Sequence, residues 1–218
     1  MAAAMTMRRR LTRTLILAGL AAAPLILAGC ADKTSASAAA NAGKGATDLT
    51  TAQGPDADLL RAAGTGNIFK VRDLLDAGAN VNAHTDNGST PLHGALYYRY
   101  PQTAELLIWR GADINARTTP QGVTPLHQAA WSDMPDSCRL LLWRGADPNA
   151  RTIEGVTPLM WAANRGNADV VKVLLDGGAR ADIRAPDGAT ALSLAQDAGH
   201  TDVVQVLQAA PATARPAS

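Results

Sequence analysis

The apolar positions between residues 56 and 210 recur with a period of 33 or 34 residues. One column consists of Leu74, Leu107, Leu141, Leu174 and Leu207. A second column stands three positions earlier in each copy, at Val71, Ala104, Cys138, Val171 and Val204. Residues three positions apart lie on one face of a helix. Each copy is therefore predicted to contain a helix whose apolar face packs against its neighbours.

In the second to fifth copies, the helix that carries these columns is preceded by the start signal of another, shorter helix. The signals are Thr90-Pro91, Thr124-Pro125, Thr157-Pro158 and Thr190-Ala191. Threonine caps a helix N-terminus, and proline fits the first turn because its missing N–H costs nothing there. A glycine motif follows the second helix in the same register, as in the segment 78–83 (Gly-Ala-Asn-Val-Asn-Ala). Two independent markers with one period predict an array of two-helix repeats.

The repeated segments resemble the ankyrin family, whose Thr-Pro-Leu-His motif stands unchanged at Thr90–His93 and Thr124–His127. The resemblance implies an all-α solenoid of about five helix–turn–helix units with β-hairpin loops. The expected units are 56–88, 89–122, 123–155, 156–188 and 189–210. It also implies a non-enzymatic protein, monomeric when free, that binds other proteins. In this family the motif histidine bonds the backbone and the threonine, so His93 and His127 are expected to be structural.

The first 29 residues have the pattern of an export signal. A basic stretch, Arg8 to Arg13, precedes an uncharged run of 15 residues, 15–29. That run is shorter than the roughly 20 residues that span a bilayer as a helix, so a signal peptide is predicted. It ends in Leu27-Ala28-Gly29-Cys30, which resembles the bacterial lipobox, where the cysteine becomes lipidated. A general signal peptide with an incidental cysteine is the alternative.

Residues 30–55 show no apolar period and are rich in Ala, Ser, Thr and Gly. Such a segment buries too little surface to offset the entropy of ordering it. We therefore expect lipidated Cys30 to be followed by a disordered tether, and residues 211–218 to form a disordered tail. By resemblance to bacterial lipoproteins, Ala31 favours the inner face of the outer membrane, in the periplasm. Membrane contact is expected through the lipid.

Charge and motif content argue against nucleic-acid binding and catalysis. The formal charge is +1, but without the four arginines of the signal the chain has 16 basic against 19 acidic residues. A nucleic-acid-binding protein is expected to carry a basic excess. The sequence has no glycine-rich phosphate loop, nucleophile motif or metal-ligand spacing, so no enzyme activity, metal or cofactor is predicted. Cys138 lies in an apolar column and is expected to act as a small apolar residue.

Neighbouring units carry candidate partner-binding residues. By resemblance, the ankyrin family contacts partners through the two positions after the alanine pair of the first helix. The candidates there and beside them are Tyr97, Tyr98, Tyr100, Trp131 and Arg165. Large aromatic residues are enriched at the centres of protein interfaces. The alternative is that these rings close over two inter-helix turns that have Arg99 and Asp133 in place of glycine. For Trp161, in the next unit, partial burial in the core is the alternative.

Two further columns offer additional contacts. A column along the hairpins consists of His84, Arg117, Arg151 and Arg184, a cationic ladder suited to an acidic partner surface. Basic residues are common at this position of the family, which is the alternative reading. Trp109 and Trp143 recur at the ends of second helices and are expected to be exposed. There, contact with lipid headgroups or a second partner competes with simple packing against neighbouring side chains.

These features predict a membrane-anchored periplasmic scaffold that binds a protein partner. By resemblance to periplasmic ankyrin proteins, the partner is an oxidative-stress enzyme such as a catalase. The same resemblance allows an immunity lipoprotein that neutralises a delivered toxin. A third alternative is an envelope-organising structural protein. The residues do not choose among them, because fold alone does not fix function.

Overall fold

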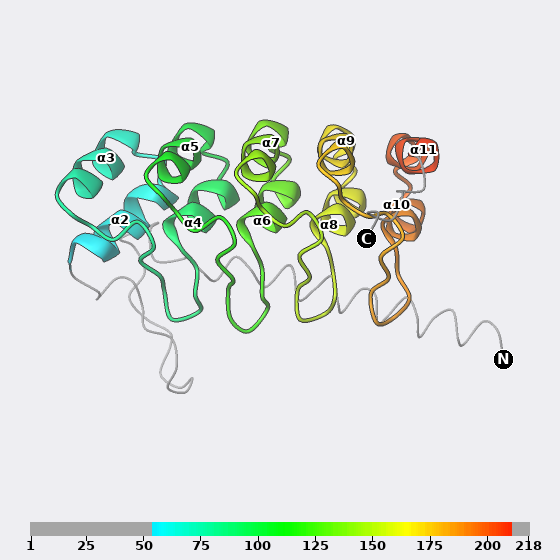
Figure 1. The fold of residues 1–218 in the computed structure, drawn as a ribbon, viewed down its shortest axis with the longest axis horizontal. Coiled ribbons are helices and arrows are strands. Elements are labelled where there is room, and N and C mark those ends of the chain that lie inside the picture. Colours follow the sequence, from blue (N-terminus) through cyan, green and yellow to red (C-terminus); the bar gives the residue numbers. More distant parts are fainter. Residues whose placement is uncertain (1–53, 211–218) are drawn as a thin grey trace, which may run out of the picture. The chain divides into compact units, whose positions relative to one another are not determined.

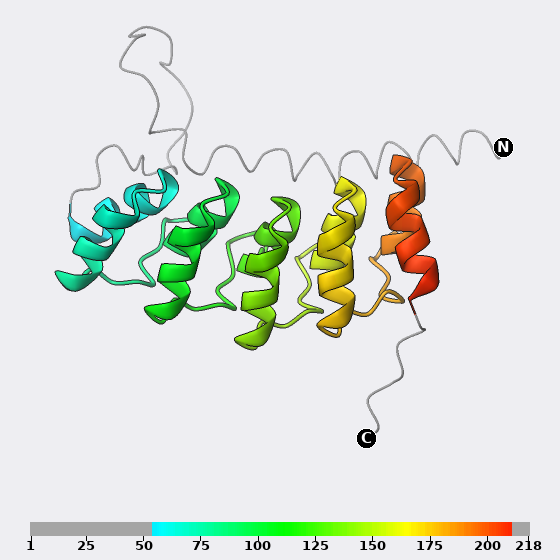
Figure 2. The ribbon, with the colours of Figure 1, turned by 90° about the horizontal axis from the view of Figure 1, so that it is seen from above.

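Five pairs of helices make up residues 54–210, the part of the chain that the computed structural model describes (Figure 1). The first helices, here called the inner row, are α2 (Pro55–Gly64), α4 (Pro91–Tyr97), α6 (Pro125–Trp131), α8 (Pro158–Arg165) and α10 (Ala191–Ala198). The second helices, the outer row, are α3 (Ile68–Asp76), α5 (Pro101–Trp109), α7 (Pro135–Trp143), α9 (Ala168–Asp176) and α11 (Thr201–Ala209). The two rows run side by side (Figures 1 and 2). The expected all-α stack of helix pairs is confirmed.

The loops between successive pairs project beyond the inner row, away from the outer row (Figure 1). Each closes on itself through backbone hydrogen bonds. The Thr85 N–H donates to the Ser89 carbonyl at 3.0 Å, and the Thr152 N–H donates to the Val156 carbonyl at 2.9 Å. Within residues 54–210 these loops are tight turns, and no strand is present. The β-hairpins expected from the resemblance are therefore reduced to their turns.

The inner helices begin where the Thr-Pro signals predict, except in the first unit. The Thr90 side chain accepts from the His93 N–H, and the His93 ring accepts from the Thr90 N–H, which closes a capping box. In the first unit α2 begins at Pro55, with Gly54 at the N-cap and no side-chain cap. The repeat register would have begun it at Asp58. The Gly-Pro start extends this helix at its N-terminus.

The two apolar columns form the seam between the units. The four residues Val71, Ala104, Cys138 and Val171 are fully buried, as are Leu107, Leu141 and Leu174. Val204 is only half-buried, because its unit is the last within residues 54–210 and no following helix pair in that range covers it. Solenoids are stabilised by such contacts between neighbouring repeats, so the seam holds the units in a fixed order.

The two motif histidines bond each inner helix to the following loop. His93 Nε2 lies 3.2 Å from the Val123 carbonyl, and His127 Nε2 lies 3.0 Å from the Val156 carbonyl. Their Nδ1 atoms accept from the N–H groups of the capping threonines. Burial lowers the pKa of both rings from 6.5 to about 4, so the rings are neutral and Nε2 donates. The structural role expected for these histidines is confirmed.

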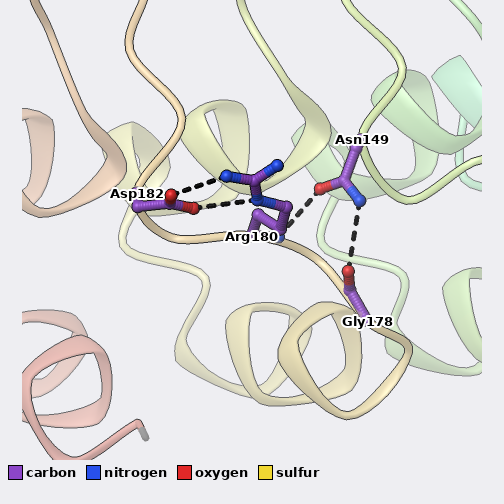
Figure 3. Close-up of polar contacts among 4 residues, drawn as sticks. All are labelled: Asn149, Gly178, Arg180 and Asp182. Carbon is purple, nitrogen blue, oxygen red and sulfur yellow. Dashed lines mark hydrogen bonds and ion pairs between the residues drawn. The ribbon is translucent and has the colours of Figure 1, made fainter. Parts of the chain in front are cut away.

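An asparagine of the glycine motif adds a second bond between units (Figure 3). Asn149 accepts from the Arg180 N–H at 2.8 Å and donates to the Gly178 carbonyl at 3.2 Å. The fourth unit has Asp182 at the equivalent position, and there Asp182 pairs with Arg180 at 2.7 Å. This hydrogen-bonded pair raises the pKa of Arg180 and lowers the pKa of Asp182. The bond between units is thus replaced by one within the last loop.

Several sequence expectations fall outside the described residues. These are the signal peptide 1–29, the lipidation of Cys30, residues 30–53 of the tether and the tail 211–218. In the part of the chain that is described, no helix is long and apolar enough to cross a bilayer.

Candidate protein-binding surface

Aromatic side chains gather where α4 and α6 of the inner row end. Tyr97 is the last residue of α4, and Tyr98 is its C-cap. Their rings meet edge to face, with centroids 4.9 Å apart and planes at 86°. Tyr98 is 37% exposed, whereas Tyr97 and Trp131, the last residue of α6, are half-buried. These three rings, placed on neighbouring units, form what we call the inner aromatic surface.

The Trp131 ring contacts one aromatic ring and one cation. Its ring lies 5.7 Å from the ring of Trp161, which is only 6% exposed and in turn meets His127 at 5.3 Å. The Arg165 guanidinium lies over the Trp131 ring, 4.5 Å from its centroid. Trp161 is therefore a core residue, and Trp131 and Arg165 extend from it to the surface. Edge-to-face ring packing and the cation fix the position of the Trp131 indole.

Polar bonds between the turns hold the helix ends that carry these rings. The Ser132 hydroxyl, next to Trp131, donates to the Tyr97 carbonyl at 3.4 Å. The Asn167 amide donates to the Ala130 carbonyl at 2.8 Å and to the Trp131 carbonyl at 3.5 Å. The ends of α4, α6 and α8 are thus tied together through carbonyls left free by helix termination.

Tyr100 lies apart from the inner aromatic surface, although it is close to Tyr97 and Tyr98 in sequence. A Cβ atom added to Gly66 would lie 2.3 Å from the Tyr100 ring. The ring therefore packs closely against the inter-helix turn of the first unit, and Tyr100 is half-buried. The alternative weighed for the aromatic residues, closure over a turn, applies to Tyr100, but the turn it covers is one that has glycine.

The arginine ladder connects successive loops. The Arg117 guanidinium donates to the Arg151 carbonyl, and the Arg151 guanidinium donates to the Arg184 carbonyl at 2.6 Å. Arg184 belongs to the last loop and makes no equivalent bond within residues 54–210. The three side chains are exposed, so their remaining N–H groups face solvent. A structural role of this ladder is directly visible in these bonds, and an additional role in partner binding stays a prediction.

The outer row carries a separate pair of tryptophans. Trp109 is 59% exposed and Trp143 is 72% exposed, and their ring centroids lie 6.4 Å apart. The Arg144 guanidinium lies 4.1 Å from the Trp109 centroid and 5.3 Å from that of Trp143. The pair is exposed as expected, and Arg144 packs against both rings.

Two exposed apolar residues were not anticipated from the sequence. Phe69, near the start of α3, and Ile153, at the tip of a loop, are both largely exposed. Ile153 could have been recognised, because the neighbouring loops carry polar residues or proline at their tips. Single exposed apolar side chains are ordinary at protein surfaces, so neither defines a site by itself.

Two possible sites for chemistry among the described residues would be a metal-binding cluster and the Cys138 thiol. No group of three or more His, Cys, Asp or Glu side chains within 54–210 is placed to hold a metal ion. Burial raises the pKa of the Cys138 thiol to about 12, so it remains protonated at neutral pH. It packs in the seam as a small apolar residue, as its column predicts.

Comparison with known proteins gives the family. A family model described as ankyrin repeats (3 copies) matches residues 30–118, 59–152 and 126–215. Because these matches cover more than half of the chain, it belongs to the ankyrin-repeat family. Ankyrin repeats are protein–protein interaction modules and are typically non-catalytic, so protein partners are the expected ligands of this array.

Curated relatives share part of the array. The chain is 42% identical over 56 residues to an ankyrin repeat-containing protein of Schizosaccharomyces pombe, covering 26% of this chain and 27% of that protein. It is 42% identical over 62 residues to cyclin-dependent kinase 4 inhibitor B of Rattus norvegicus, covering 28% and 47%. It is 38% identical over 63 residues to 2-5A-dependent ribonuclease of Mus musculus, covering 28% and 9%. The chain thus spans less than half the length of these relatives.

Proposed function

We propose that this chain is a non-enzymatic scaffold that binds one protein partner through the inner aromatic surface. We further propose that it is exported and held by a lipid on Cys30 in the periplasm, at the inner face of the outer membrane. The partner proposed first is an oxidative-stress enzyme that the scaffold supports, such as a catalase. A delivered toxin, neutralised by the scaffold, is the rival partner.

The support for binding comes from the arrangement around Trp131. Interface hot spots are large aromatic or arginine side chains that sit in a pre-formed position beside solvent. The Trp131 ring contacts the buried Trp161 ring and the Arg165 guanidinium, and Tyr97 and Tyr98 lie on the neighbouring unit. Because these side chains are already fixed before binding, little conformational entropy is lost in ordering them when a partner binds.

The relatives add general support for a protein ligand. The name of the Rattus norvegicus relative describes an inhibitor of a cyclin-dependent kinase, that is, of another protein. The match with the Mus musculus ribonuclease covers 9% of that protein, which gives no ground to propose ribonuclease activity here. The proposal therefore takes binding, and no catalytic activity, from this family.

A capture experiment tests the binding proposal. Tagged wild type and the Tyr97→Ala/Trp131→Ala variant are used as baits in extracts of the cells that make the protein, and the retained proteins are identified. We expect a protein that wild type retains and the variant loses. The matched control is Trp109→Ala/Trp143→Ala, which removes two aromatic rings from the outer row and is expected to retain the same protein. Equal retention by all three baits would contradict the proposal.

The identity of the captured protein separates the rival partners. A catalase or related enzyme supports the first, and a secreted hydrolase or other toxin supports the second. If instead, in a Cys30→Ala background without the lipid anchor, the outer-row variant alone loses association with the cell envelope, the envelope-organising alternative is supported. The exposure of Trp109 and Trp143 is the observation that favours this second function.

The lipid anchor has its own test. Cells making wild type or Cys30→Ala are labelled with palmitate, and the protein is isolated. We expect label in wild type and none in the variant, because the thiol is the attachment point. Equal label in both would contradict the lipoprotein assignment while leaving the binding proposal intact.

A further inference from the structure

The five inter-helix turns share a left-handed backbone but not a residue type. Their central residues are Gly66, Arg99, Asp133, Gly166 and Gly199, with φ of 69°, 61°, 54°, 79° and 77°. Glycine adopts this conformation freely, whereas a side chain disfavours it, arginine more than aspartate. The second and third units therefore hold strained backbone at positions where the same fold elsewhere uses glycine.

Neighbouring side chains explain two of the three glycines. A Cβ at Gly66 would meet the Tyr100 ring at 2.3 Å, and one at Gly166 would meet the His200 ring at 2.7 Å. The last turn is different, since a Cβ at Gly199 would meet nothing within 4 Å. A side chain would fit at Gly199, so glycine is explained there by its left-handed backbone conformation alone. Free space at this turn is therefore not a sufficient reason for a residue other than glycine.

The fold gains little from Arg99 and Asp133. Arg99 Nη2 reaches the Asp133 carbonyl at 3.5 Å, at the limit of a hydrogen bond. The Asp133 carboxylate forms no hydrogen bond or ion pair with any residue from 54 to 210. Both side chains are exposed. Strained backbone that does not stabilise its own fold is concentrated at functional sites, where the side chain is needed for another purpose.

The position of both residues indicates that purpose. Arg99 directly follows Tyr98, and Asp133 follows Ser132, which is bonded to the Tyr97 carbonyl. The contact between Arg99 and Asp133 shows that their turns are adjacent. Both charges therefore stand at the edge of the inner aromatic surface. Charges at the rim of an aromatic contact select among partners.

We propose that Arg99 and Asp133 are specificity-determining contacts for the protein partner, retained at a cost in stability. This inference rests on the proposed function of the inner aromatic surface. With Arg165 on the next unit, the exposed charges run positive, negative, positive along the array. The partner that fits is a protein surface presenting an acidic, a basic and an acidic side chain in the matching order beside an apolar patch.

The stability half of the proposal is tested without a partner. Thermal unfolding of the full chain is compared for wild type, Arg99→Gly and Asp133→Gly. We expect each glycine to raise Tm by about 2–4 °C through relief of the left-handed strain. Gly199→Asp is the matched control, because it places a side chain in the same turn without a steric clash, and its Tm is expected to fall. A lower Tm for Arg99→Gly and Asp133→Gly would overturn the proposal.

The binding half uses the protein captured by the wild-type bait, purified and titrated against each variant. We expect Arg99→Gly and Asp133→Asn to weaken binding about tenfold each, and Arg99→Lys to retain most of the affinity. Asparagine tolerates the left-handed turn as aspartate does, so Asp133→Asn removes the charge alone. The control Gly199→Asp is expected to bind as wild type does.

The outcomes separate this inference from the proposed function. Unchanged affinity of Arg99→Gly and Asp133→Asn, with loss in Tyr97→Ala/Trp131→Ala, would overturn the role of the two turns and leave the aromatic surface intact. Unchanged affinity in all of these variants would overturn both. Tighter binding by Asp133→Asn would show that the partner is acidic at this point, which also contradicts the proposed order of charges.

Discussion

The inner and the outer row each present tryptophan packed against arginine, but the two arrangements differ in what lies beneath. Trp131 rests on buried Trp161, which contacts the motif histidine His127. Trp109 and Trp143 project from the ends of outer helices, and Arg144 of the same surface packs against both. The inner tryptophan is thus an extension of the core, whereas the outer pair is supported mainly by its own cation. Within one repeat array, a tryptophan packed on the core is therefore held in position before binding, whereas an exposed tryptophan is not held by the core.

The largest expected effect comes from the two buried histidines of the inner row, which should make the free energy of unfolding fall in acid. His93 and His127 stay neutral in the folded inner row because burial lowers their pKa to about 4, whereas the unfolded chain takes up protons near pH 6.5. Stability is therefore present at neutral pH and is lost as pH falls from 6.5 towards 4. We expect the free energy of unfolding to drop by about 5 kcal/mol for the two histidines between pH 7.5 and 4.5.

Denaturant titrations at a series of pH values measure this loss. His93→Gln and His127→Gln are each expected to be less stable than wild type at pH 7.5, since a cap and a bond between units are lost. Each is also expected to show a shallower decline with acid. If both variants declined as steeply as wild type, the neutral histidines would not be the source of the pH dependence.

Truncation of a tryptophan should affect the two rows unequally. Trp161→Ala is expected to lower the free energy of unfolding by about 3–5 kcal/mol, the usual cost of a large cavity in a packed core. Trp143→Ala removes a ring that is 72% exposed and is expected to cost less than about 1 kcal/mol. Urea unfolding of both variants makes the comparison, and equal losses would contradict the distinction between a supported and an exposed ring.

A small effect is also expected from Arg144, which packs against the outer pair. Its guanidinium contacts both outer rings, and its Nε and Nη2 atoms are buried without a hydrogen-bond partner. Because cation–π contacts contribute about 0.5–1 kcal/mol, Arg144→Ala is expected to destabilise the chain by about 1 kcal/mol. Tryptophan fluorescence during unfolding reports this directly. A loss above about 3 kcal/mol would mean that Arg144 supports the core and not only the outer pair.

The repeat architecture could be predicted from sequence because its signals are local. Thr90-Pro91 and its copies mark helix starts, and the leucine columns mark the seam, so the helix pairs follow from short stretches of chain. The start of α2 at Pro55, one residue before the expected first unit at 56, does not follow from the repeated signals, because Gly54-Pro55 starts a helix in a different way from the repeated threonine. A register inferred from copies fails where a terminal copy has its own signal.

Side-chain environment was harder to predict, because it depends on residues one repeat away. Tyr100 follows Tyr98 closely in sequence, yet its ring packs on Gly66 of the preceding unit. Trp161 could not be placed from sequence, since the equivalent positions carry Gln128 and Leu194, one polar and one apolar. The loss of glycine at Arg99 and Asp133 was visible in the sequence, but only φ values of 61° and 54° show that the turns keep the glycine conformation.

The most direct test of the account is the affinity of the captured partner for Trp131→Ala compared with Trp143→Ala, measured by titration calorimetry on folded protein. A hot spot contributes at least about 2 kcal/mol, so Trp131→Ala is expected to weaken binding about thirtyfold or more. Trp143→Ala is expected to bind within about twofold of wild type, as surface residues outside an interface do. Wild-type affinity in Trp131→Ala, or a large loss confined to Trp143→Ala, would contradict the claim that the partner binds the inner aromatic surface.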